Sequence, residues 1–144
     1  IDRVEPDGQQ DEIGHGLVQY FSTQGHFIEN NKLTYYRKAS GNQKAAFSYV
    51  MNIKPNHDNF LYLHFKDKAS YNEHAFILVN DSVITEREEG APKELLIQIP
   101  KQLITNTSQI TVCIQVANET AYTGSLTEMR TLSAPIDLSL NDMN

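Results

Sequence analysis

The segment Ile110-Thr111-Val112-Cys113-Ile114-Gln115-Val116 decides the fold class of this chain. Its apolar side chains recur at every second position, which is the spacing of a β-strand that buries one face. The same period recurs over residues 95–99 and 47–53, and residues 60–65 alternate two kinds of apolar side chain. Residues 76–84 form two short apolar runs around a polar turn, a pattern that is typical of a β-hairpin.

Helical periodicity is weak throughout the 144 residues. No stretch of about eleven residues or more keeps the apolar spacing of an amphipathic helix, and one isolated turn is expected around residues 100–103. Short strands between turn clusters favour an all-β fold, a β-sandwich or jelly roll of about seven to nine strands. We expect residues 1–135 to form this sandwich and residues 136–144 to form a C-terminal edge strand or tail. Residues 1–16 are expected to be a loop that is entered by a short strand at residues 2–4.

Composition excludes several classes of protein. Twelve basic residues against eighteen acidic ones give a net charge of −6, which argues against nucleic-acid binding because that needs a basic patch. No apolar run is longer than about five residues, so no membrane span is expected. The single cysteine excludes an internal disulfide and a cysteine-based zinc cluster. The chain begins at Ile1 without an initiator methionine, and we expect it to be part of a longer polypeptide.

Familiar catalytic motifs are missing from the sequence. None of the five histidines lies in an H-E-x-x-H motif or has a second histidine or cysteine at metal spacing, and no G-x-S-x-G segment is present. Cys113 falls on the polar side of its expected strand, where we interpret it as a small packing residue and not as a nucleophile. A conventional glycosidase needs two carboxylates, and the acidic residues at 86–89 are expected to fall in a charged loop. An enzyme with an unrecognised carboxylate pair therefore stays as a minor alternative.

One part of the sequence combines hydrogen-bonding side chains more densely than an ordinary loop does. Its members come from residues 9–15 and from a later tyrosine–arginine pair: Gln9, Gln10, Glu12, His15, Tyr36 and Arg37. Such groups cost free energy when they are buried without partners. We expect Arg37 to pair with Glu12 or Asp11 through a charge-assisted fork. Two interpretations stay open: an internal clasp that ties the N-terminal segment to the sheet, or a polar ligand pocket with aromatic walls.

The same residues carry a family likeness. The motif Asp2-x-Val4-x-Pro6-x-x-Gln9-Gln10-x-Glu12-x-x-His15 is followed by Tyr36-Arg37-x-Ala39 and Phe47-Ser48-Tyr49. This pattern resembles a β-sandwich domain of unassigned function at the C-terminal end of bacterial proteins, common in gut Bacteroides, that are related to the β-L-arabinofuranosidases of glycoside hydrolase family 127. The likeness covers residues 2–132. The related domains often carry tryptophan where this chain has Ala46.

The resemblance implies a non-catalytic role. Enzymes of that family use a helical barrel with a cysteine nucleophile in a zinc site, and this chain has neither the helices nor the cysteines. The resemblance therefore implies an accessory domain of a polysaccharide-degrading glycoside hydrolase in the periplasm or outside the cell. It also implies that the domain packs against the catalytic domain of the same polypeptide and binds plant-type polysaccharide. A purely structural or oligomerisation domain without a ligand is the alternative. No cofactor is expected, and the presence of a structural calcium ion stays open.

Overall fold

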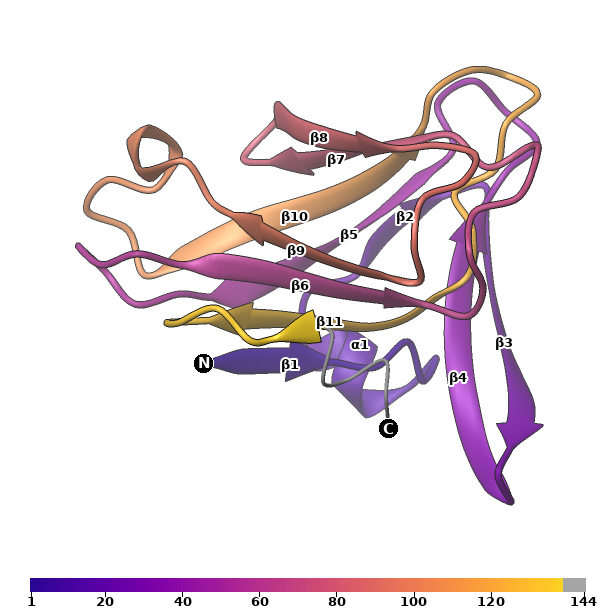
Figure 1. The fold of residues 1–144 in the computed structure, drawn as a ribbon, viewed down its shortest axis with the longest axis horizontal. Coiled ribbons are helices and arrows are strands. Elements are labelled where there is room, and N and C mark those ends of the chain that lie inside the picture. Colours follow the sequence, from indigo (N-terminus) through magenta and orange to yellow (C-terminus); the bar gives the residue numbers. More distant parts are fainter. Residues whose placement is uncertain (139–144) are drawn as a thin grey trace.

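The computed structural model describes residues 1–138 and arranges them as two antiparallel sheets that face each other (Figure 1). The first sheet has the order β3-β4-β11-β6-β9, and β1 also pairs with β11. Its strands are β1 (Asp2–Val4), β3 (Ser22–Glu29), β4 (Lys32–Ala39), β6 (Phe60–Phe65), β9 (Glu94–Gln98) and β11 (Leu126–Leu132). The second sheet has the order β2-β5-β10-β7-β8. Its strands are β2 (Val18–Tyr20), β5 (Ala46–Asn52), β7 (Ala75–Val79), β8 (Ser82–Arg87) and β10 (Gln109–Val116).

The predicted all-β sandwich is confirmed, with eleven strands in the described part of the chain where about seven to nine were expected. The alternating segments form β5, β6, β9 and β10, because a strand can bury one face when every second side chain is apolar. The hairpin predicted at residues 76–84 is the pair β7–β8. Its two-residue turn holds Asn80 and Asp81 at φ of 49° and 69°, the left-handed conformation that a tight hairpin turn requires. The isolated turn predicted near residue 100 is the short 3-10 helix η1 (Lys101–Leu103).

The prediction that residues 1–16 form a loop after a short strand is wrong for residues 10–14. Strand β1 has the expected position, but the short helix α1 (Gln10–Gly14) follows it. Five residues are too few to show a helical period in the sequence, and so short a helix is not stable by itself. Strands β3 and β4 form a hairpin that extends away from the sandwich, and their alternation is weak because residues such as Ile28 and Leu33 stay exposed (Figure 1).

The hydrophobic core lies between the two sheets. The second sheet contributes alternate side chains of β5 and β10, namely Phe47, Tyr49, Met51, Ile110, Val112, Ile114 and Val116. The first sheet contributes Leu61, Leu63, Phe65, Leu126 and Met129. Burying one such apolar side chain stabilises a fold by about 1.5–3 kcal/mol. Polar side chains are buried beside this core where α1 meets β4 and β5, and these belong to the candidate site.

The C-terminal segment leaves the sandwich after β11. Residues 133–137 form neither a helix nor a strand. The edge strand or tail was predicted at residues 136–144, and residues 139–144 lie outside the described residues. None of the helices within residues 1–138 is long and apolar enough to cross a membrane.

Candidate functional site

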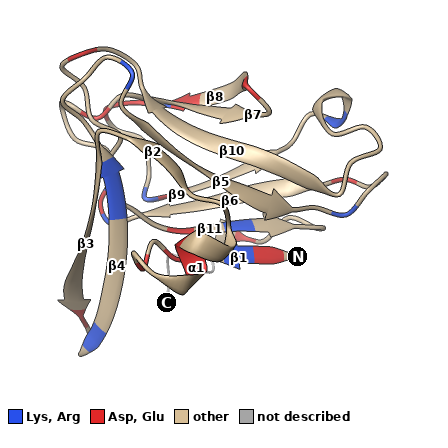
Figure 2. Ribbon diagram, turned by 180° about the vertical axis from the view of Figure 1, so that it is seen from behind, with Lys and Arg blue, Asp and Glu red and all other residues tan. Residues whose placement is uncertain are grey.

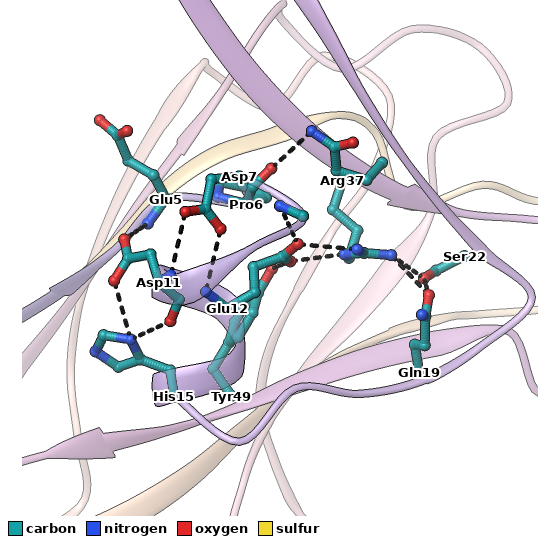
Figure 3. A network of polar contacts seen from close by, with 12 residues as sticks. Glu5, Pro6, Asp7, Asp11, Glu12, His15, Gln19, Ser22, Arg37 and Tyr49 are labelled. Atoms are coloured by element: carbon teal, nitrogen blue, oxygen red, sulfur yellow. Dashed lines mark hydrogen bonds and ion pairs between the residues drawn. The ribbon is translucent and has the colours of Figure 1, made fainter.

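Asp7 organises the start of α1. Its Oδ1 accepts hydrogen bonds from the backbone amides of Gln9 at 2.9 Å and Glu12 at 3.2 Å, and its Oδ2 accepts one from the amide of Asp11 at 3.1 Å. Burial would raise the pKa of the Asp7 carboxyl, but these amide bonds outweigh burial and hold the pKa below its usual range. Gly8 supplies the positive φ of 70° that the chain needs to turn here. The turn directs the side chain of Glu12 into the edge of the sandwich (Figure 3).

Glu12 and Arg37 form a buried ion pair between α1 and β4. Arg37 donates its Nε to Glu12 Oε2 at 2.7 Å and its Nη2 to Oε1 at 2.9 Å, which is the fork predicted from the sequence. The amide of Gly8 donates to Oε1 at 2.8 Å. The two side chains are 1% and 5% exposed. Burial lowers the pKa of Arg37, but the hydrogen bonds and charge of Glu12 outweigh burial and raise it above its ordinary value.

Tyr49 and two polar side chains complete this arrangement, which we call the Glu12 cluster (Glu12, Gln19, Ser22, Arg37 and Tyr49). Tyr49 donates its hydroxyl to Glu12 Oε2. Burial, and then the hydrogen bond to Glu12, raise the pKa of Tyr49, so the hydroxyl stays a donor. Arg37 Nη1 donates to Gln19 Oε1 at 2.6 Å and to Ser22 Oγ at 2.7 Å. The cluster thus joins α1 to four strands, β2 to β5 (Figure 3).

His15 fastens the other end of α1. Its Nε2 contacts Asp2 Oδ1 at 2.9 Å, and its Nδ1 contacts the backbone oxygen of Asp11 at 2.7 Å. Asp2 Oδ2 also accepts the amide of Asn52 at 2.8 Å. Burial lowers the pKa of His15, but the bonds to Asp2 and Asp11 outweigh burial and raise it above its ordinary value. The imidazole therefore links β1 to α1 best in its charged form, and Asp2 in turn connects both to β5.

The other predicted site residues lie apart from the Glu12 cluster. Gln9 and Gln10 are exposed at the start of α1. Tyr36 precedes Arg37 on β4, so its side chain points to the opposite face of the sheet. There its ring lies 6.3 Å from the ring of Phe27 and covers Gly25, where a Cβ atom would collide with the tyrosine ring. Tyr36 is thus not an aromatic wall of the Glu12 cluster.

An exposed aromatic pair lies where β2 leads into β3. The rings of Tyr20 and Phe21 are 4.8 Å apart, and both residues are 52% exposed. Phe21 has a φ of 52°, which is strained for a bulky residue and marks a backbone held in place by its surroundings. Tyr20 pairs across the strands with Ala46, so its ring lies on the same outer face of the second sheet as Ala46. The preceding residue, Gln19, belongs to the Glu12 cluster.

The candidate site thus has two parts: a buried cluster that holds the fold together and an exposed aromatic surface. Glu12, Arg37 and Tyr49 satisfy one another inside the fold and present little surface to a ligand, whereas Tyr20 and Phe21 offer exposed ring area. The pattern of polar residues in the sequence does not predict the cluster members Gln19, Ser22 and Tyr49, and it does not predict Phe21. Tyr49 could have been found, because it falls on the inward face of a predicted strand and its hydroxyl needs a partner. Residues 18–22 have no pattern that marks them.

Cys113 has the properties of a packing residue. It lies half-buried on β10, and its side chain faces away from the core. Burial, and then the nearby charge of Asp81, raise the pKa of the Cys113 thiol to about 11. A thiol with that pKa is almost entirely protonated at neutral pH and is a poor nucleophile.

Together the sheets and this site define a β-sandwich domain of jelly-roll type. The chain belongs to a family of unknown function (DUF6805), whose family model matches residues 1–132. A search of curated proteins finds no match.

Solved structures share the fold at low sequence identity. A family 35 carbohydrate-binding module (CBM35) from Paenibacillus barcinonensis is 12% identical with a TM-score of 0.64, and the alignment covers 92% of this chain and 98% of that one. The family 35 module from Clostridium thermocellum is 13% identical with a TM-score of 0.60, covering 82% and 92%. A GH26-CBM35 β-(1,4)-mannanase from Podospora anserina is 13% identical with a TM-score of 0.59, and the alignment covers 94% of this chain but 28% of that larger one.

Proposed function

We propose that this chain is a non-catalytic, carbohydrate-binding accessory domain of a polysaccharide-degrading glycoside hydrolase that acts in the periplasm or outside the cell. The observation that carries the proposal is the exposed Tyr20–Phe21 pair on a fold that the chain shares with carbohydrate-binding modules. Aromatic rings bind sugars because the apolar CH face of a pyranose or furanose ring packs on the ring surface. The mannanase neighbour supports an accessory role, since there the same fold lies within a longer enzyme chain.

The proposed sugar-binding surface consists of Tyr20 and Phe21. Gln19 precedes Tyr20 on β2, so its side chain points to the opposite face of that strand, where it accepts from Arg37. In this proposal Glu12 and Arg37 do not contact the sugar. Through Gln19 on β2 and Ser22 on β3, they hold the two strands that flank the aromatic pair against α1 and β4. The exposed Gln9 and Gln10 are further candidate contacts for a long polysaccharide.

Isothermal titration calorimetry against fragments of arabinan, pectin and arabinogalactan tests the proposal. The wild-type chain should bind at least one of these glycans, and Tyr20→Ala should weaken that binding by about tenfold, which corresponds to ~1.4 kcal/mol. Tyr71→Ala is a matched control, because Tyr71 is an exposed tyrosine (82%) on a different loop. No binding of any fragment at millimolar concentration would contradict carbohydrate binding. A loss in Tyr71→Ala and not in Tyr20→Ala would contradict the proposed surface.

A second candidate function is structural packing against the catalytic domain of the same polypeptide. The outer face of the second sheet carries a row of neighbouring residues that crosses all five strands: Val18, Ser48, Cys113, Leu78 and Val83. Val18 is 68% exposed and Val83 is 56% exposed, so the row presents apolar area to solvent. In the longer polypeptide, deleting this domain should lower the solubility or melting temperature of the remainder. An unchanged melting temperature, solubility and quaternary state would contradict the structural role.

A further inference from the structure

Four loops meet at one end of the sandwich, which we call the loop end (residues 40–45, 66–74, 88–93 and 117–125; upper right in Figure 1). Backbone bonds tie them together. Tyr122 forms isolated bridges with Ser40 and Glu73, and its backbone oxygen accepts the amide of His74 at 3.1 Å. The oxygen of His74 in turn accepts the amide of Ala117 at 2.9 Å. The backbone of His74 is therefore fixed on both sides.

Three metal-ligating side chains converge at this end. His74 precedes β7, Glu86 lies near the end of β8, and Glu88 follows β8. Because Arg87 is buried and side chains alternate along a strand, Glu86 and Glu88 both project outward. The register places Ala75 opposite Arg87, so His74 faces outward beside them. One nitrogen or oxygen atom from each of the three side chains lies within 4.8 Å of the others.

The distances suit a small divalent cation. His74 Nε2 lies 2.6 Å from Glu86 Oε2 and 3.8 Å from Glu88 Oε2. Two ligands of a tetrahedral zinc ion, each at about 2.0–2.2 Å from the metal, lie about 3.3 Å apart. The two observed separations bracket that value, so small rotations of exposed side chains would bring the three atoms to coordinating positions. His74, Glu86 and Glu88 are 34%, 50% and 67% exposed, which leaves them room to move.

The local charge also favours a cation. His74 is the basic side chain that Glu86 and Glu88 contact within residues 1–138. The neighbouring positive charge of Arg87 is taken up by Glu73, whose Oε2 accepts from Arg87 Nη1 at 2.5 Å inside the fold. The acidic segments around the end of β8 are visible in Figure 2. The hollow beside these side chains is lined by Tyr71, Glu73, His74, Glu88 and Glu89, so carboxylates dominate its charge.

We propose that His74, Glu86 and Glu88 form a surface site for a divalent transition-metal ion, with zinc as the best match. Zinc accepts mixed imidazole and carboxylate ligands, and three protein ligands leave a fourth position for water. Calcium fits less well, because it prefers six to eight oxygen ligands. A bound ion would link the start of β7 to the end of β8 and so stabilise the loop end.

Calorimetric titration of the whole chain with zinc chloride in a non-chelating buffer tests this site. The wild type should bind one equivalent, and zinc should raise its melting temperature. His74→Gln and Glu86→Gln should each weaken binding by at least about tenfold. His57→Gln is the matched control, because His57 is an exposed histidine in a distant turn, and it should bind zinc like the wild type. A calcium titration is expected to give much weaker binding.

Three results would overturn the proposal: no zinc binding at millimolar concentration, equal zinc affinity of wild type and His74→Gln, or a loss of binding in His57→Gln as large as in His74→Gln. Circular dichroism spectra of the variants establish that each is folded, and the substitutions leave the backbone bonds of His74 in place. The assay contains no sugar, so its outcome is independent of the proposed carbohydrate binding.

Discussion

Replacing Glu12 with alanine should cost more stability than any surface substitution in this chain. Glu12 accepts hydrogen bonds from Gly8, from Tyr49 and twice from Arg37. In Glu12→Ala the guanidinium of Arg37, 5% exposed, loses its counter-ion, and the buried Tyr49 hydroxyl loses its acceptor. Loss of one partner of a buried ion pair typically costs about 3–5 kcal/mol. That is a large part of the roughly 5–15 kcal/mol that stabilises a domain.

Urea unfolding followed by circular dichroism measures this cost. With a urea dependence of about 2 kcal/mol per molar, a loss of 3–5 kcal/mol lowers the unfolding midpoint by roughly 1.5–2.5 M. The chain contains no tryptophan, so a circular dichroism signal is the more direct probe. Arg37→Ala should give a loss of similar size, because it leaves the Glu12 carboxylate buried and unpaired.

The matched control is an exposed ion pair. Lys101 lies 3.0 Å from Asp58, with side chains that are 68% and 48% exposed, and Lys101→Ala should cost at most about 1 kcal/mol because water screens that pair. If Glu12→Ala shifts the midpoint no more than Lys101→Ala does, Glu12 is not a buried clasp. The cluster would then be an accessible polar site, and the assignment of its residues to a structural role would be refuted.

Three further predictions follow from charges and close contacts. Because folding raises the pKa of His15, its ion pair contributes stability that is complete below the ordinary pKa of 6.5 and is lost as the pH rises through the folded-state pKa. Because folding lowers the pKa of Asp2, this carboxylate contributes stability that is present above its ordinary pKa of 3.8 and is lost as the pH falls through the folded-state pKa. As the pH rises from about 6 to about 8, the urea unfolding midpoint should therefore decrease more in the wild type than in His15→Gln. An equal decrease of the midpoint in both proteins would contradict the ion pair. The pKa of about 11 predicts that iodoacetamide labels Cys113 slowly at neutral pH until urea unfolds the chain, whereas labelling at the rate of an open thiol would show that burial is incomplete. Gly90→Ala, at a φ of 90° with nothing within 4 Å of an added Cβ, should cost about 1–2 kcal/mol of strain. Gly124→Ala, at a φ of 82°, should lower the thermal midpoint further, because its Cβ would lie 2.5 Å from Glu73 Oε2, and similar midpoints for the two variants would argue against that close packing.

The sequence was most informative where one face of a strand is buried. Residues 110–116 alternate because β10 lies in the centre of its sheet and buries every second side chain, so period two alone identifies the strand. The β7–β8 turn was also predictable, because Asn80 and Asp81 tolerate the left-handed conformation that a two-residue hairpin needs.

The sequence was least informative where polar contacts or exposure determine the local structure. Helix α1 has no apolar stripe, and its stability comes from Asp7 and from the Glu12–Arg37 pair, which is distant in sequence. The pair itself could be predicted, because two opposite charges beside a core need each other. The position of Phe21 beside Tyr20 could not be predicted, because an exposed ring has no periodic partner and a strained φ leaves no trace in composition.

The pairing of β1 with β11 determines how the domain responds to mechanical force. The strands are antiparallel, with Asp2 opposite Thr131 and Val4 opposite Met129. Any chain that continues from residue 1 and any chain that continues from residue 132 therefore leave from the same corner. Tension between such segments would break the β1–β11 hydrogen bonds one after another. This is the unzipping geometry, in contrast to the shear geometry, in which all the bonds bear the force together. The domain should thus yield at low force and release β1 as a short extensible tether while the rest of the sandwich stays folded.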